Sequence, residues 1–213
     1  MGLLRYLEYY LARLLYSQKG RDAKLLTRAA IFATVPKTVQ VTSPTLGPSP
    51  AHLSVEHTQF GTSRFPDLSW SLEDGVDSVK EWLLICEDPD APLPLVPVHG
   101  LYYAIPATKT TVGPDDFTLA VDSSKTAPAD EPGAKHLAGG FRLGKNLRGT
   151  LYSGPRPPVG HGEHRYFFQV VALKSRLDTK KMKPLATRDD VLREIQGKIC
   201  AWGEWVGIFE HKW

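Results

Sequence analysis

From about residue 37 onward the hydrophobic pattern becomes that of β-strands, with alternating residues at 39–41 and apolar runs farther along. Alternating or continuous apolar runs predict strands at 39–41, 81–86, 98–105, 117–121, 166–173 and 203–209. Apolar residues recur at helical spacing over 191–199, after Thr187 in an N-cap position followed by acids. Because the strands are not interleaved with helices, the pattern predicts a mainly β fold, an antiparallel β-sandwich with peripheral helices.

The first 36 residues follow a different pattern, with six Lys/Arg against two acids. Leucines recur there at helical spacing: Leu3, Leu7, Leu11, Leu14 and Leu15. A basic amphipathic helix can lie on an anionic membrane or target an organelle. The two acids and the tyrosines favour the alternative, in which the leucine stripe packs back onto the main domain. We therefore expect a helical N-terminal extension at 1–36, with peripheral membrane contact as its alternative role, and one domain at 37–213.

Composition and charge narrow the class of protein. The net charge is only +3 and the basic residues are scattered, which argues against nucleic-acid binding. The two cysteines, Cys86 and Cys200, lie far apart, so a cysteine zinc site is excluded and Cys86 is expected to be a buried strand thiol. No run is long enough for a transmembrane helix, and charges interrupt any secretory signal. We expect a cytoplasmic protein, with a mitochondrial or membrane-peripheral location through residues 1–36 as the alternative.

Two acids separated by prolines follow the apolar run 81–86, in the segment Asp88-Pro89-Asp90-Ala91-Pro92. Each proline fixes its own φ and holds the preceding residue extended, so the segment is a rigid corner whose carboxylates have restricted directions. The alternative is a capping or Asx-type turn at the end of a strand.

His99 begins an apolar strand eleven residues after Asp88, which is enough chain to return to the same end of a sheet. The alternative for His99 is a hydrogen-bonded core histidine. Farther along, the stretch 122–162 is rich in Gly and Pro, and a loop of this length in a compact domain is usually functional.

His164 and Tyr166 lie on one face of the predicted strand and Arg165 on the other, where it could pair with Asp90. Two rings with hydrogen-bonding tips on one face can line an anion pocket. We interpret His161 as a solvated loop histidine.

A zinc site would need these histidines together with Asp88, but the H-x-x-H spacing of His161 and His164 is unusual for zinc on a strand or loop. We expect no metal and no cofactor. A Ser-His-Asp hydrolase is excluded by the absence of G-x-S-x-G in a strand-turn-helix context.

Three segments in this order resemble the phosphatidylethanolamine-binding protein family, also called Raf-kinase-inhibitor-like proteins. Asp88 to Pro92 match its D-P-D-A-P signature, and His99 to Pro106 resemble its histidine-led strand. Its G-x-x-P-P…H-R-Y segment is similar to Gly154, Pro157 and Pro158 followed by His164, Arg165 and Tyr166. The resemblance covers about residues 38–210 and is greatest to fungal members, while the helical extension lies outside it.

The resemblance implies a large central antiparallel sheet with a smaller sheet on one side and helices on the other. It also implies a pocket for phosphate-like groups or the head group of phosphatidylethanolamine. By motif, the ligand-binding residues are Asp88, Asp90, Pro92, His99, Gly154, Pro155, His164 and Tyr166. Many members have cysteine where this chain has Arg156, which could add a phosphate or carboxylate contact.

The function implied by the resemblance is the binding of a small anion or phospholipid head group. Two alternatives stay open. The first is an enzyme of a fungal pathway to dimeric anhydrides (maleidrides), in which family members are implicated in cyclisation. The second is an inhibitor of a kinase or protease. No catalytic residue can be assigned from the residues alone.

Overall fold

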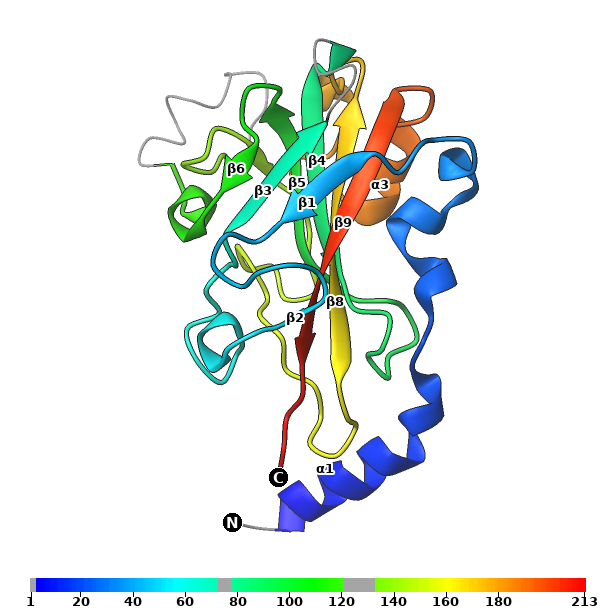
Figure 1. Ribbon diagram of the computed structural model, residues 1–213, viewed down its shortest axis with the longest axis vertical. Helices are drawn as coiled ribbons and strands as arrows, with labels where there is room; N and C mark the ends of the chain where they lie inside the picture. Colours follow the sequence, from blue (N-terminus) through cyan, green and yellow to red (C-terminus); the bar gives the residue numbers. More distant parts are fainter. Residues whose placement is uncertain (1–2, 73–77, 121–132) are drawn as a thin grey trace.

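A computed structural model describes residues 3–72, 78–120 and 133–213 (Figure 1). A larger sheet has the strand order β2-β9-β8-β4-β5-β7, and a smaller sheet in front of it has the order β1-β3-β6. The strands are β1 (Val39–Thr42), β2 (Ala51–His52), β3 (Leu68–Leu72), β4 (Glu81–Glu87), β5 (Val98–Pro106), β6 (Thr111–Val112), β7 (Arg142–Leu143), β8 (His164–Leu173) and β9 (Ile199–Phe209). Neighbouring strands are antiparallel except β2 and β9.

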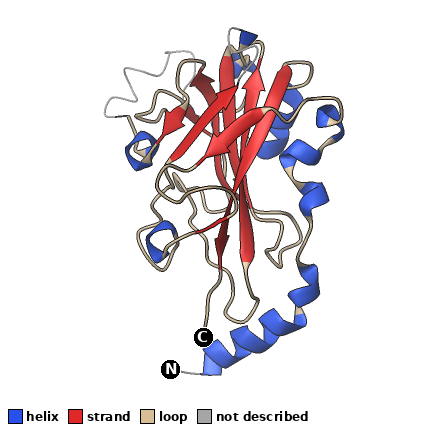
Figure 2. Cartoon of the chain, viewed as in Figure 1, coloured by secondary structure: helices blue, strands red, loops and turns tan. Residues whose placement is uncertain are grey.

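The helical elements lie at the periphery of the two sheets (Figure 2). The α-helices are α1 (Leu3–Leu14) and α3 (Arg188–Glu194). Short 3-10 turns span Tyr16–Gln18, Asp22–Lys24, Leu26–Arg28, Ala30–Phe32, Val55–His57, Pro114–Phe117 and Thr179–Lys181. The predicted mainly β sandwich with peripheral helices is therefore confirmed.

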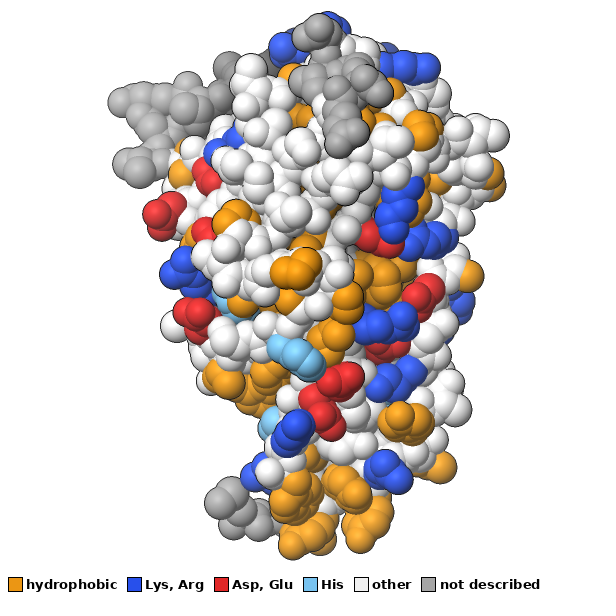
Figure 3. All heavy atoms as spheres, viewed as in Figure 1, with side chains coloured by type: hydrophobic (Ala, Val, Ile, Leu, Met, Phe, Trp, Pro, Cys, Tyr) orange, Lys and Arg blue, Asp and Glu red, His pale blue; other side chains and the backbone are white. Residues whose placement is uncertain are grey.

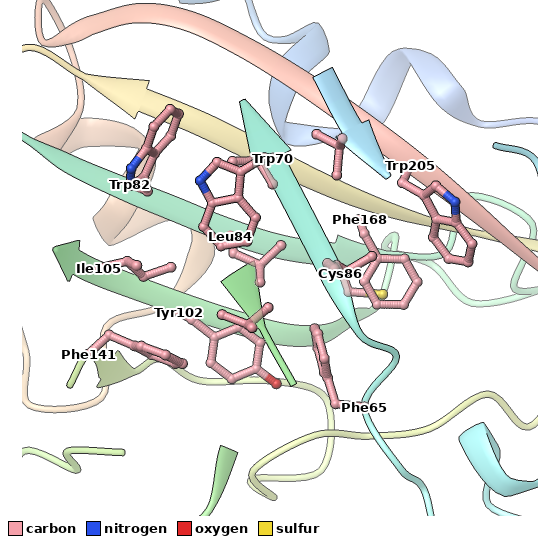
Figure 4. Packing of buried hydrophobic residues seen from close by; sticks show 14 of the residues in the cluster. Phe65, Trp70, Trp82, Leu84, Cys86, Tyr102, Ile105, Phe141, Phe168 and Trp205 are labelled. Atoms are coloured by element: carbon pink, nitrogen blue, oxygen red, sulfur yellow. The ribbon is translucent and has the colours of Figure 1, made fainter. Parts of the chain in front are cut away.

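The central strand β4 is buried along its whole length because both faces of the larger sheet are covered. Trp82, Leu84 and Cys86 point into the core between the two sheets, where aromatic rings predominate (Figure 4). Leu83 and Ile85 point into a second core on the opposite face, which α3 and the N-terminal extension cover. Cys86 is buried and free, as expected from its apolar run.

The N-terminal extension runs along the larger sheet after α1 crosses its lower end (Figure 1). Leu26 and Phe32 are buried in the second core, and the Leu26 N–H donates to Glu87 Oε2 at 2.7 Å. The leucine stripe of α1, however, does not pack on the domain as expected: Leu3 and Leu14 are 85% and 77% exposed.

α1 is held instead by contacts of Ala12, Tyr9 and Glu8. Ala12 is buried, and the ring of Tyr9 meets Trp213 edge-on at 5.5 Å between centroids. The first glutamate of the helix, Glu8, accepts a hydrogen bond from the Val159 N–H at 3.2 Å. The helix therefore leaves Leu3 and Leu14 directed outward.

Two predicted elements differ from the structure. Phe117 ends a 3-10 turn instead of beginning a strand, because Pro114 occupies the first turn and Asp116 caps the Gly113 N–H at 2.9 Å. The rest of that predicted strand includes residue 121, which lies outside the described residues.

The predicted helix 191–199 stops early, since α3 ends at Glu194 and Ile199 already begins β9. Its predicted N-cap is confirmed: Thr187 Oγ1 accepts the Asp190 N–H at 3.2 Å, and Asp190 accepts the Thr187 N–H at 2.9 Å. Residues 122–132 of the stretch predicted to be irregular lie outside the described part of the chain. Among the described residues of that stretch, β7 is the one regular strand.

Candidate functional site

The site residues gather at one end of the larger sheet because three strands begin or end there. Glu87, the last residue of β4, pairs with Val98 on β5 and with Phe167 on β8. The corner that follows β4 therefore lies beside the first residues of both neighbours. This register brings Asp88, His99, His164 and Tyr166 together, although up to 78 residues separate them in sequence.

The two carboxylates of the proline corner point in different directions. Asp88 Oδ1 accepts the Asp90 N–H at 2.8 Å, which closes an Asx-type turn. Asp88 Oδ2 lies 2.8 Å from His164 Nδ1 and 4.0 Å from His99 Nε2. One carboxylate oxygen of Asp88 thus closes the turn, while the other faces the two histidines.

Asp90 faces Arg165, as the strand alternation predicted. Its oxygens accept from Arg165 Nε and Nη2, both at 2.8 Å, and from the Gly20 N–H at 2.9 Å. Burial raises the pKa of Asp90, but these donors outweigh it and hold the pKa below its ordinary value. The guanidinium also binds Asp22 at 2.7 Å, so the Asp90 carboxylate is occupied by a brace between the corner and the extension.

Two hydrogen bonds fix the position of His164. Its Nδ1 lies 2.8 Å from Asp88 Oδ2, and its Nε2 lies 2.7 Å from His161 Nδ1. His161 Nε2 in turn lies 3.2 Å from the carbonyl oxygen of Leu15. The interpretation of His161 as a solvated loop histidine is wrong, because its side chain is fully buried in this chain of contacts.

The proton count along this chain follows from its two ends. A carboxylate and a carbonyl only accept, so the three hydrogen bonds require three protons from the two imidazoles. Two neutral imidazoles supply two, so with both rings neutral one of the three contacts lacks its proton. Burial lowers the pKa of His161. Both nitrogens of His164 are engaged by protein groups.

His99 differs from His164 because one of its nitrogens has no partner. Its Nδ1 donates to the carbonyl oxygen of Ser153 at 2.5 Å, while Nε2 is buried without a hydrogen bond. Burial lowers the pKa of His99, and the Asp88 carboxylate and Ser153 carbonyl offset this only in part. The ring is therefore neutral near pH 7, with a lone pair on Nε2.

Two tyrosine side chains likewise carry a buried polar atom without a hydrogen-bond partner. The hydroxyls of Tyr166 and Tyr152 are buried and make no hydrogen bond. The ring of Tyr166 meets His99 edge-on, with 5.1 Å between centroids. Burial raises the pKa of both phenols well above the ordinary value, so each remains an O–H donor. Tyr152 was missed from the sequence, because nothing distinguishes it within an irregular Gly- and Pro-rich stretch.

The remaining predicted residues lie in the loops around this cluster. Gly154 packs so closely that a Cβ there would lie 2.8 Å from the His57 carbonyl oxygen. Gln59 ties this loop down through the carbonyl oxygens of Gly154, at 2.7 Å, and Pro155, at 3.0 Å. Pro92 lies farther out, at a groove beneath α1. Arg156 is exposed to solvent.

The described residues contain neither a cluster of metal-ligating side chains nor a membrane-spanning helix. Within the described ranges, no three His, Cys, Asp or Glu side chains are arranged to hold a metal ion. No helix in that part of the chain has both the length and the apolar character needed to cross a bilayer.

The fold and the site define a two-sheet β protein with a buried histidine–carboxylate–tyrosine cluster at one end of its central sheet. The family model described as phosphatidylethanolamine-binding protein matches residues 44–210, and the chain belongs to this family. Two solved members share its fold. E. coli YbcL is 25% identical with a TM-score of 0.63, and a Chlamydia trachomatis homologue is 23% identical with a TM-score of 0.62. Each match covers 82% of this chain and 99% of the other.

Fungal relatives match over almost the whole chain. The phomoidride biosynthesis cluster protein B of Talaromyces stipitatus is 45% identical over 212 residues, covering 99% of this chain and 84% of that protein. The protein of the same name from Fungal sp. is 40% identical over 213 residues, covering 100% of this chain and 98% of the other. These matches include the N-terminal extension and support a fungal type of family member.

Proposed function

We propose that this chain binds a small organic anion at His99 and Tyr166, and that it does so in a fungal biosynthetic pathway. One observation carries the proposal: His99 Nε2 and the Tyr166 hydroxyl are buried polar atoms without a hydrogen-bond partner, and they belong to two rings in edge-on contact. Leaving such an atom unsatisfied costs about 1–3 kcal/mol, and a ligand that bonds both atoms recovers that free energy on binding.

The chemistry of the two groups selects the ligand. Tyr166 is a donor, and neutral His99 presents a lone pair at Nε2 until it gains a proton. A carboxylate or phosphate that arrives with a proton, or takes one up from solvent, satisfies both. Asp88 stands 4.0 Å from His99 Nε2 and stabilises the imidazolium once it forms.

The names of the fungal relatives support the biosynthetic part of the proposal. They are cluster proteins for phomoidride biosynthesis, and their similarity extends over the whole chain. Among the ligands of suitable chemistry, we therefore favour a carboxylate or anhydride intermediate over a phosphatidylethanolamine head group. A free basic nitrogen beside a phenol could also move a proton on such a ligand, which is the basis of the enzyme alternative. Binding of a kinase or protease stays a prediction.

Isothermal titration calorimetry with methylmaleate, inorganic phosphate and phosphoethanolamine tests the proposal. We expect wild type to bind at least one, with His99→Gln and Tyr166→Phe each weakening it about tenfold or more. Tyr103→Phe is the matched control, because Tyr103 is also fully buried but lies in the second core. Absence of binding to all three ligands, or equal affinity in all variants, would refute the proposal.

A further inference from the structure

One face of α1 carries apolar side chains that remain in contact with solvent. Its members recur at steps of three and four residues, so they share one side of the helix: Leu3, Leu7, Tyr10 and Leu14 are 85%, 54%, 67% and 77% exposed. Single exposed apolar residues are common, but a continuous row of them marks an interaction surface. α1 lies outside residues 44–210, which the family model matches, so this surface is separate from the family core.

Aromatic side chains extend this surface to the last residue of the chain. The rings of Tyr6 and Trp213 lie 5.1 Å apart between centroids, and they are 54% and 59% exposed. The guanidinium of Arg5 lies over the Trp213 ring at 4.9 Å. Figure 3 shows hydrophobic side chains gathered at the end of the molecule where Figure 1 places α1 and the C-terminus. Trp and Tyr are the residues enriched where a bilayer meets water.

The charge of this part of the chain is positive. Residues 1–36 contain six Lys/Arg and two acids, so they account for the whole net charge of +3. Arg13 is exposed on α1 next to Leu14. The one acid of Leu3–Leu14, Glu8, already accepts a hydrogen bond from the Val159 N–H. An apolar row beside cationic side chains is complementary to a surface that is anionic outside and hydrocarbon beneath.

We propose that the outward face of α1, together with Trp213, binds the surface of an anionic lipid bilayer. The helix lies in the plane of the interface, with Leu3 and Leu14 entering the boundary between head groups and acyl chains. Tyr6 and Trp213 lie at the level of the head groups, and Arg13 meets lipid phosphates. This binding does not depend on the ligand of the buried site, so either proposal can fail without the other.

A second copy of the chain fits this surface less well. A helix of twelve residues offers a strip about 18 Å long and about 10 Å wide. Each partner of a stable complex buries about 800 Å², which is several times the area of that strip. Two arginines and one glutamate on each α1 also make two copies repel each other. A bilayer has no such area requirement and carries the opposite charge.

Trp213 supplies a direct probe of this binding, because the other four tryptophans are at most 8% exposed. Vesicles of POPC and POPS at about 3:1 should shift the fluorescence maximum of the full chain to shorter wavelength. Brominated lipid in the same vesicles should quench the emission. Trp213→Phe should lose the shift and the quenching while still sedimenting with the vesicles, which assigns the signal to this residue.

Variants separate the apolar and the charged parts of the surface. The double variant Leu3→Ser/Leu14→Ser should lower partitioning onto the vesicles about tenfold or more. Arg13→Gln should lower it about fivefold on POPC/POPS and leave partitioning onto POPC alone unchanged. Leu119→Ser is the matched control, since Leu119 is 49% exposed and follows β6 in a segment away from α1 in Figure 1. It should bind like wild type.

Defined outcomes would overturn the inference. One is wild type that neither sediments with POPC/POPS vesicles nor shifts its fluorescence, and another is equal partitioning of Leu3→Ser/Leu14→Ser and wild type. Binding that requires POPE and is indifferent to POPS would point to a head-group site instead. A dimer in light scattering that the double variant abolishes, without vesicle binding, would assign the face to a second copy. Thermal unfolding of each variant confirms that these exposed substitutions leave the fold intact.

Discussion

Binding of an anion at His99 should consume one proton. The Nδ1–H of His99 donates to the Ser153 carbonyl oxygen, so the neutral ring presents a lone pair at Nε2. Burial lowers the pKa of this ring, which keeps it neutral near pH 7 in the free protein. An anionic oxygen placed against that lone pair is repelled, whereas protonation of Nε2 converts the contact into a charge-assisted hydrogen bond.

The size of the effect follows from proton linkage. The complex holds one proton more than the free protein and ligand, so affinity falls as pH rises. For one proton the Kd weakens about tenfold per pH unit above the pKa of free His99, or about 1.36 kcal/mol per unit. Between about pH 7 and 9 a phosphate monoester no longer titrates, since its second pKa is about 6, and the slope then reports the protein alone.

Calorimetry with methyl phosphate provides the measurement. Titrations in buffers of different ionisation enthalpy give the number of protons taken up, which we expect to be about one in wild type. His99→Gln should bind more weakly and take up none, because glutamine offers an N–H without titrating. Binding of wild type that is independent of pH, or unchanged proton uptake in His99→Gln, would refute the assignment of the proton to His99.

Three further predictions concern stability. Arg165→Leu leaves the buried Asp90 carboxylate without its guanidinium partner, so the free energy of unfolding measured in urea should fall by about 2–4 kcal/mol. The low end of this range allows for the 35% exposure of the arginine side chain. An unchanged urea midpoint would contradict a stabilising Asp90–Arg165 ion pair. The site histidines with lowered pKa resist protonation in the folded state, so Tm should be constant above about pH 7 and fall as the pH drops through their unfolded value of about 6.5; a Tm that rises toward acid would contradict this. Gly203→Ala places a Cβ 1.9 Å from the Val39 carbonyl oxygen and should destabilise by about 3 kcal/mol, and equal thermal melts would show that β9 can move there.

The local parts of the site could be predicted from sequence. The prolines restrain Asp88 and Asp90 within a segment of five residues. Strand alternation places the side chains of Arg165 and Tyr166 on opposite faces of one strand. Both are short-range constraints, and the Asp90–Arg165 pair is present as expected. The register of β4 with β5 and β8 then completes the cluster. The spacing of Asp88 and His99 indicated that both could lie at one end of the sheet, and the family resemblance indicated the rest.

The remaining features depend on distant contacts. His161 lies between Gly160 and Gly162, a setting typical of an exposed turn, but its partner Leu15 comes from 146 residues away. The amphipathic pattern of α1 shows that one face of the helix is apolar, but it does not show which face packs on the domain. The contact between Tyr9 and Trp213, which are far apart in sequence, fixes the orientation of the helix.

A crystal structure with bound methylmaleate or methyl phosphate tests the central claim most directly. The account predicts a ligand oxygen about 2.6–3.2 Å from both His99 Nε2 and the Tyr166 hydroxyl, with the Asp90–Arg165 pair unchanged. A saturating ligand bound elsewhere on the chain, with those two atoms still lacking a partner, would contradict it.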